Sequence, residues 1–153
     1  MKRLYHLVVF LVCCATTLSA QTFTPPFGLS YKMGKEDIRK VLLTNGTTEN
    51  CDAVTRCHYY PDDLKLNGFA VKEITCIIEF DGLLSTVFVN LKYVSKKNYT
   101  NLKMVYEKLY GNPTETDESV ESVTWVSNDG TTVYIHFTPT QGNLCIMYFC
   151  CNY

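Results

Sequence analysis

The sequence predicts an α+β domain in which two αβββ units form one antiparallel sheet, with two helices packed on one of its faces. Three observations lead to this prediction. Two segments carry apolar residues at helical spacing, and each ends at a glycine. Strand-like runs follow each of them, and one pair of runs is joined by Asp81-Gly82, a strong hairpin signal. The part of the chain after residue 20 has the size of one domain, so we expect residues 21–153 to fold as a unit.

Residues 1–20 have the pattern of a secretory signal peptide. Lys2 and Arg3 give a positive start, residues 4–12 are mostly apolar, and residues 18–20 end in small side chains. The apolar run is too short to span a bilayer. We therefore expect the mature chain to start at Gln21 and to be secreted or periplasmic.

Two cysteines within this leader, Cys13 and Cys14, raise an alternative. Lipidation of either one would make the chain an outer-membrane lipoprotein. Leu11-Val12 before them lacks the small residue expected next to a lipidated cysteine, whereas Ala20 suits cleavage. The sequence therefore favours export without a lipid anchor.

The charge of the mature chain limits its partners. Loss of Lys2 and Arg3 with the leader lowers the formal net charge from −1 to −3. A nucleic-acid partner usually needs a basic face, and adhesion to an anionic membrane needs basic residues too. We therefore expect neither partner, and no apolar stretch after residue 20 is long enough to span a membrane.

The first half begins with a helix over Lys35–Leu43. Ile38, Val41 and Leu42 lie at helical spacing, and Asn45-Gly46 stops the pattern. A short strand over Thr55–Tyr60 follows.

The hairpin is the clearest part of this half. Its two strands are predicted over Val71–Phe80 and Leu83–Val94. A two-residue turn at Asp81-Gly82 pairs Phe80 with Leu83 and Cys76 with Val87. One face of the hairpin is then almost wholly apolar and the other mostly polar, as in a sheet that is covered on one side.

The second half repeats this order. A helix over Tyr99–Tyr110 ends at Gly111, and the acidic stretch Glu115–Glu121 is interpreted as a solvated loop. Three strands are predicted after it. They are Ser122–Ser127, Thr131–Thr138 and Leu144–Cys151.

Two registers compete for the hairpin around Asn128-Asp129-Gly130. A two-residue turn would leave Trp125 on the polar face. A three-residue loop with Gly130 in the left-handed conformation puts Trp125, Val133 and Ile135 on one face, and it leaves His136 outside. We favour the three-residue loop, because a slip of one residue moves every side chain to the wrong face.

Two motifs resemble a known class of protein. The run from Phe27 to Leu42 resembles a helix opening of small exported bacterial domains, and Tyr110-Gly111-Asn112-Pro113 followed by Trp125 looks like their second half. A leader ending in Ser-Ala-Gln is similar to those of Bacteroides-type bacteria. The sequence departs from the pattern at Lys32, where a turn glycine is usual, and at Gly34, where a capping Ser or Thr is usual.

This resemblance implies an uncharacterised secreted α+β domain. More distantly, it points to helix-plus-sheet modules of the β-lactamase-inhibitor type and of the small lipoprotein in outer-membrane barrel assembly. Those modules act by binding protein. The resemblance therefore implies a binding role here.

Six cysteines remain after the leader, and an even number in an exported chain indicates disulfides. Cys150 and Cys151 end a strand, so one of them faces away from the core. Cys51 and Cys57 lie in or beside a loop-rich stretch. We therefore hypothesise one disulfide from Cys150 or Cys151 to Cys51 or Cys57, and we expect Cys76 to remain a buried thiol.

The sequence offers little catalytic chemistry. A cysteine nucleophile, Cys57 or Cys151, could pair with His58 or His136, but no electropositive site for it is visible. A zinc set would have to come from dispersed residues without the paired C-x-x-C spacing. That set is Cys51, Cys57, His58, Cys150 and Cys151. We predict no catalytic residue, no metal and no cofactor.

A surface for a partner is the remaining candidate. Four side chains are expected on the polar face of the sheet, where an apolar and aromatic patch indicates a contact surface. They are Ile77, Phe88, Tyr134 and His136. Coverage of the patch by a terminal loop or by a dimer mate is the alternative.

The predicted function is that of an exported, non-enzymatic domain that binds a protein or cell-envelope partner. The alternative is a small exported enzyme or redox protein that uses its cysteines.

Overall fold

The computed structural model describes residues 22–92 and 94–150. The predicted leader with Cys13 and Cys14, the start at Gln21 and residue Cys151 lie outside this range. The described residues form two helices, α2 (Lys35–Thr44) and α3 (Lys96–Tyr110), and one nine-stranded antiparallel sheet. The strands are β1 (Thr47–Ala53), β2 (Arg56–Pro61), β3 (Lys65–Leu66), β4 (Phe69–Ile78), β5 (Leu84–Leu91), β6 (Glu115–Asp117), β7 (Ser122–Val126), β8 (Thr131–Thr138) and β9 (Asn143–Cys150). Neither described helix is long and apolar enough to cross a bilayer.

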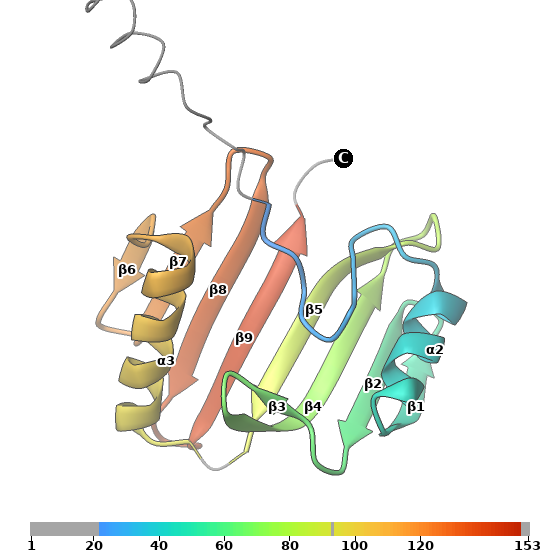
Figure 1. Cartoon of the computed structure of the whole chain (residues 1–153), viewed down its shortest axis with the longest axis horizontal. Coiled ribbons are helices and arrows are strands. Elements are labelled where there is room, and N and C mark those ends of the chain that lie inside the picture. Colours follow the sequence, from blue (N-terminus) through green and yellow to red (C-terminus); the bar gives the residue numbers. More distant parts are fainter. Residues whose placement is uncertain (1–21, 93, 151–153) are drawn as a thin grey trace, which may run out of the picture.

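The sheet has the order β1-β2-β4-β5-β9-β8-β7-β6, and the short β3 pairs with β4 (Figure 1). Each half is a meander of four strands, and the halves meet where β5 pairs with β9. The predicted antiparallel sheet is confirmed. The prediction of three strands in each unit is wrong, because each helix is followed by four strands of this order.

The prediction missed the two-residue β3 and two longer strands, which lie at the two edges of the sheet. β1 is polar along nearly its whole length, and all three residues of β6 are exposed. An edge strand has one neighbour and buries few side chains, so it lacks the apolar alternation that identifies a strand in a sequence. For the same reason, the acidic stretch of β6 was predicted as a loop.

The helices agree with the predictions except at the start of α3. α2 begins at the predicted residue and buries Ile38 and Leu42 completely. α3 begins three residues earlier than predicted, because Ser95 and Asn98 form a reciprocal capping box. It ends as predicted, with Gly111 at φ +82° as its C-cap.

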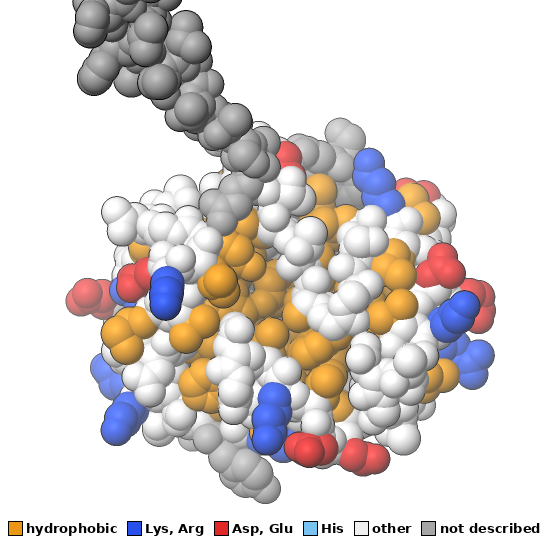
Figure 2. All heavy atoms as spheres, in the orientation of Figure 1, with side chains coloured by type: hydrophobic (Ala, Val, Ile, Leu, Met, Phe, Trp, Pro, Cys, Tyr) orange, Lys and Arg blue, Asp and Glu red, His pale blue; other side chains and the backbone are white. Residues whose placement is uncertain are grey.

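Both helices lie on the same face of the sheet, and the segment 22–33 runs between them (Figure 1). Phe23 and Leu29 of this segment are buried against the sheet. Figure 2 views this side of the molecule: hydrophobic side chains gather in its middle, and charged side chains lie mainly toward its periphery. We call this the helix face of the sheet and the opposite one the open face.

The predicted register of the β7–β8 hairpin is confirmed. Trp125 pairs with Val133, Ser127 N donates to Thr131 O at 2.9 Å, and Gly130 has φ +80°. Trp125 lies on the helix face, is 1% exposed, and its indole Nε1 donates to the Gly111 carbonyl at 2.9 Å.

The predicted two-residue turn of the β4–β5 hairpin is wrong. Glu79 N donates to Leu83 O at 2.9 Å, so the loop has three residues and Phe80 sits in it, 101% exposed. The predicted pairing of Cys76 with Val87 nevertheless holds. A β-bulge makes this possible, because Ile77 pairs with Thr86 and Ile78 with Leu84, which leaves Ser85 as an extra residue.

Candidate functional site

The open face carries the four side chains that were predicted as a partner surface. Phe88 of β5 and Tyr134 of β8 both pair with Met147 of β9, so these three side chains form one row across the middle of the sheet. Ile77 of β4 lies beside this row, because its cross-strand partner Thr86 precedes Phe88 by two residues on β5. All five of these residues are partly exposed.

His136 lies one step along β8 from Tyr134 on this face. The two rings stack at 6.0 Å between their centroids, and His136 also lies opposite Cys145. The structure therefore brings Phe88, Tyr134 and His136 together with Met147, which the sequence prediction did not include. Met147 was missed because the prediction fixed no register between the two halves of the sheet.

Further apolar side chains lie on both sides of this row. Tyr60 of β2 is 40% exposed and Val126 of β7 is 49% exposed, and alternation along their strands places both on the open face. Phe149 of β9 lies between Thr86 and Thr132. We use the name apolar patch for Ile77, Phe88, Tyr134, Met147 and Phe149.

Carboxylates flank the apolar patch at both edges of the sheet. Asp52 and Glu73 contact His58 on the β1–β4 side. Glu115 and Asp117 of β6 pair with open-face positions of β7 on the opposite side. The centre of the face is thus apolar and carboxylates lie on both of its sides, while the exposed Arg56 lies next to the patch as the cross-strand partner of Ile77.

A polar cluster around His58 lies on the acidic side formed by β1, β2 and β4. Glu73 Oε1 is 2.6 Å from His58 Nδ1, Asp52 Oδ2 is 3.4 Å from Nε2, and Thr75 Oγ1 is 3.1 Å from Nδ1. Asn90 Nδ2 donates to the other oxygen of Glu73 at 3.3 Å. A carboxylate only accepts, so Nδ1 donates its proton to Glu73 and is unavailable to deprotonate the buried Thr75. The geometry therefore suits a structural or binding role better than a nucleophilic one.

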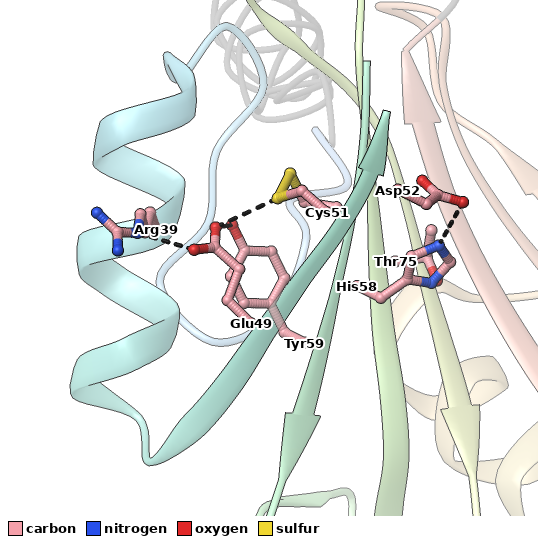
Figure 3. The surroundings of a disulfide bond; sticks show 8 residues. Arg39, Glu49, Cys51, Asp52, His58, Tyr59 and Thr75 are labelled. Carbon is pink, nitrogen blue, oxygen red and sulfur yellow. Dashed lines mark hydrogen bonds and ion pairs between the residues drawn. A yellow bond between two sulfur atoms is a disulfide. The ribbon is translucent and has the colours of Figure 1, made fainter. Parts of the chain in front are cut away.

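The pairing of the disulfide cysteines differs from the pairing predicted from the sequence. Cys51 is bonded to Cys57, with 4.1 Å between their Cα atoms, and they are cross-strand partners on β1 and β2 (Figure 3). The hypothesised bridge from either of them to Cys150 or Cys151 is therefore wrong; Cys150 has a free thiol, and Cys151 is not described. The physical reason is that β1 is a strand, so the two cysteines face each other across a two-residue turn.

Glu49 organises the surroundings of this disulfide on the helix face. Its Oε2 accepts from Arg39 Nε of α2 at 2.8 Å, and its Oε1 accepts from Tyr59 OH at 2.9 Å (Figure 3). The same Oε1 lies 3.5 Å from Cys51 Sγ. The bond with Glu49 raises the pKa of Arg39, and burial, with Glu49 second, raises the pKa of Tyr59.

Two of the three described free thiols, those of Cys76 and Cys145, are poor candidates for a nucleophile. Cys76 is fully buried, as predicted, and burial raises its pKa to about 12. Burial and then the nearby Glu73 raise the pKa of Cys145 to about 11. Cys145 faces His136, a pairing that the sequence did not reveal, but a thiol with a raised pKa is not a reactive thiolate at neutral pH.

One cavity lies away from all of these groups. It has a volume of about 490 Å³ and opens beside Lys72, Lys92 and Asn143, near the ends of β4, β5 and β9. None of the predicted site residues lines it. Its two lysines are surface groups and do not by themselves define a ligand site.

No protein-family model, no curated protein and no solved structure matches the chain. The resemblance to small exported bacterial domains therefore stays a prediction, and the function must be argued from the geometry of the chain alone.

Proposed function

We propose that this chain is an exported, non-enzymatic domain whose open face binds a protein with an apolar centre and basic flanks. The row of Phe88, Met147 and Tyr134 across three adjacent strands carries the proposal. Contiguous apolar and aromatic side chains on an uncovered sheet face are typical of contact surfaces. Neither described helix lies on this side of the sheet (Figure 1).

The charges around the apolar patch define the chemistry of the partner. Asp52 and Glu73 lie on one side, and Glu115 and Asp117 lie on the other. A partner with Lys or Arg around an apolar centre would complement both sides.

Two observations favour binding over the alternative of a thiol enzyme. The thiols of Cys76 and Cys145 have raised pKa values, and His58 Nδ1 is held by Glu73 rather than by a nucleophile. Export is supported by the signal-peptide pattern of residues 1–20 and by the disulfide between Cys51 and Cys57.

Site-specific photo-crosslinking in cells that make the protein tests this proposal. A benzophenone side chain replaces Phe88 or Tyr134, and a control replaces Met104, which is 54% exposed on α3. We expect both open-face positions to crosslink one basic protein, and the control position to leave it unlabelled. The complex should weaken as salt rises, because the flanking charges lie near the surface.

Three results would count against the proposal. Crosslinks from Phe88 to peptides of this same chain would make a second copy the occupant. Equal labelling at Met104 would show that the open face is not selective. Failure of both open-face positions to crosslink any protein, while the variants accumulate and melt like the wild type, would leave the face without a partner.

A further inference from the structure

We propose that Glu49, Cys51 and Cys57 form a zinc site when their disulfide is reduced. One ligand atom from each of these residues lies within 4.8 Å of the other two. Two thiolates and a carboxylate are ligands that zinc accepts, with water in the fourth position. This inference is independent of the proposed binding role of the open face, because these three side chains lie on the helix face.

The geometry fits a tetrahedral ion. Zinc lies about 2.3 Å from a thiolate sulfur and about 2.1 Å from a carboxylate oxygen, so a tetrahedral angle separates sulfur and oxygen by about 3.6 Å. The distance from Cys51 Sγ to Glu49 Oε1 is 3.5 Å. Two thiolates on one zinc ion lie about 3.8 Å apart. Cys51 and Cys57 are direct cross-strand partners, so rotation of their side chains can reach this separation once the S–S bond is broken.

The groups around the site would hold the carboxylate and balance the charge. Arg39 and Tyr59 each donate a hydrogen bond to Glu49, and such outer partners orient metal ligands. Two thiolates and one carboxylate carry three negative charges. One zinc ion and the guanidinium of Arg39 together neutralise them.

The site is accessible from the edge of the sheet. β1 is an edge strand, and Cys51 is exposed whereas Cys57 is fully buried. A reductant can therefore approach the sulfur of Cys51, and a metal ion can enter from the same side. Figure 3 shows the Glu49 carboxylate between Arg39 of α2 and Cys51.

The chemical steps balance with a dithiol as the reductant. The dithiol supplies two electrons and two protons, the Cys51–Cys57 bond breaks to give two thiols, and the dithiol becomes a disulfide. Zinc then displaces both protons into solution and binds the two thiolates with Glu49. An oxidant that restores the disulfide would release the ion, so metal binding is controlled by redox state.

Cobalt(II) titration of the whole protein tests this inference, since cobalt reports thiolate ligation by its charge-transfer absorption. Protein is reduced on an immobilised dithiol, separated from it without oxygen, and compared with oxidised protein. We expect one equivalent of cobalt to bind reduced protein with thiolate absorption, zinc to displace it, and oxidised protein to bind none. Glu49→Gln should weaken binding at least about 10-fold, as loss of a metal-orienting or ligating group does.

Matched cysteine variants decide which sulfurs are used. Cys51→Ser and Cys57→Ser should lose the thiolate absorption, whereas Cys76→Ser and Cys145→Ser should keep it. The double variant with both Cys51 and Cys57 changed to Ala shows by a cooperative melt that the fold survives without the disulfide. Reduced, folded protein without thiolate absorption, or an absorption that persists in Cys51→Ser, would overturn the inference.

Discussion

The β4–β5 and β7–β8 hairpins have turns of the same type, but their strands pair differently after the turn. In each, a three-residue loop ends in Asp-Gly, and the glycine has a positive φ, +84° at Gly82 and +80° at Gly130. In each, the aspartate Oδ1 accepts at 3.0 Å from the residue after the glycine, Leu83 N or Thr131 N. The local sequence Asp-Gly therefore determines the turn in both places.

The ladders that leave these turns differ. β7 and β8 pair in register from Val126 with Thr132 to Ser122 with His136. In the β4–β5 hairpin a continuous ladder would turn Val87 and Val89 to the open face, and the bulge at Ser85 returns them to the helix face, where both are fully buried. In the β4–β5 hairpin the turn and the burial of these side chains favour different registers, and the bulge reconciles the two.

The turns also differ in their anchoring. Asp129 accepts from Thr22 Oγ1 at 2.6 Å and from Thr131 Oγ1 at 2.7 Å, and Phe23 N donates to Thr131 Oγ1 at 2.9 Å. The β7–β8 turn thus holds the N-terminal segment. The β4–β5 turn carries the fully exposed Phe80. Beside it, backbone bonds from Lys32 N to Leu84 O at 3.0 Å and from Leu84 N to Met33 O at 2.9 Å hold the other end of the same segment.

Single-residue deletions test this difference in pairing and are expected to give the largest changes in the free energy of unfolding. Deletion of Ser85 removes the bulge and leaves Val87 opposite Cys76, so we expect a cooperative melt with a loss of about 1–3 kcal/mol for the buried hydroxyl and its bond to Glu79. Deletion of Thr132 reverses the alternation of β8 and turns three buried apolar side chains to the open face. That change costs about 5–9 kcal/mol, which is comparable to the stability of a whole domain.

Urea melts followed by circular dichroism measure both deletions. The deletion of Thr132 should show no cooperative transition, while the deletion of Ser85 keeps one. The explanation of the bulge at Ser85 fails if the two deletions lower stability equally.

Two aromatic residues test the same contrast at the level of side chains. Trp125→Ala should destabilise by about 3–5 kcal/mol, because the ring is buried against Tyr106 and Tyr110. Phe80→Ala, in the other hairpin, should change stability by less than about 0.5 kcal/mol, because Phe80 is fully exposed. His136→Ala on the open face is expected to have a similarly small effect. Thermal melts of the three variants rank these costs, and a reversed order would contradict the register of β7 and β8.

The sequence predicted the central strands of the sheet better than its edge strands. Apolar alternation identified the central strands and placed Trp125 in the core, since those side chains must be buried on one face. It gave no sign of β1 or β6, because edge strands bury too little to select apolar residues. It also missed the bulge at Ser85, since a local turn signal contains no information on how a distant core adjusts the ladder.

The candidate site was predictable only in part. Ile77, Phe88, Tyr134 and His136 lie on the open face as expected, because two hairpin registers suffice to place them. Met147 joined them only through the pairing of β5 with β9, which joins the two halves of the sheet and has no signal within either hairpin. The disulfide of Cys51 was misassigned for a related reason: without β1 as a strand, nothing indicated that Cys57 faces it.

The glycines of the two turns should respond alike if the turns are equivalent. Gly82→Ala places a Cβ in open space, so its cost comes from the left-handed backbone alone and should be about 1–2 kcal/mol. Gly130→Ala should cost about the same, because its φ is nearly equal. Equilibrium unfolding in urea measures both. A difference between the two variants of more than about 1 kcal/mol would show that the shared loop geometry does not dominate.

The smallest expected effect is the change in Tm on replacing the aspartate of either turn, and this change depends on pH. Hydrogen bonds from Ser127, Thr22 and Thr131 lower the pKa of Asp129 well below its usual range. A carboxylate whose pKa is lower in the folded state stabilises the protein above its unfolded-state pKa of about 3.9, and it loses that contribution as the pH falls through the folded-state value.

Asp129→Asn should therefore lower the Tm at pH 7, and the difference in Tm from the wild type should narrow below about pH 4. Asp81→Asn is the matched control, because Asp81 accepts the same turn bond from Leu83 N, whereas Asp129 also accepts from the side chains of Thr22, Ser127 and Thr131. We expect it to lower the Tm less at pH 7. Melting curves between pH 2 and pH 7 decide the point, and a gap for Asp129→Asn that stays constant across this range would show that its charge does not anchor the turn.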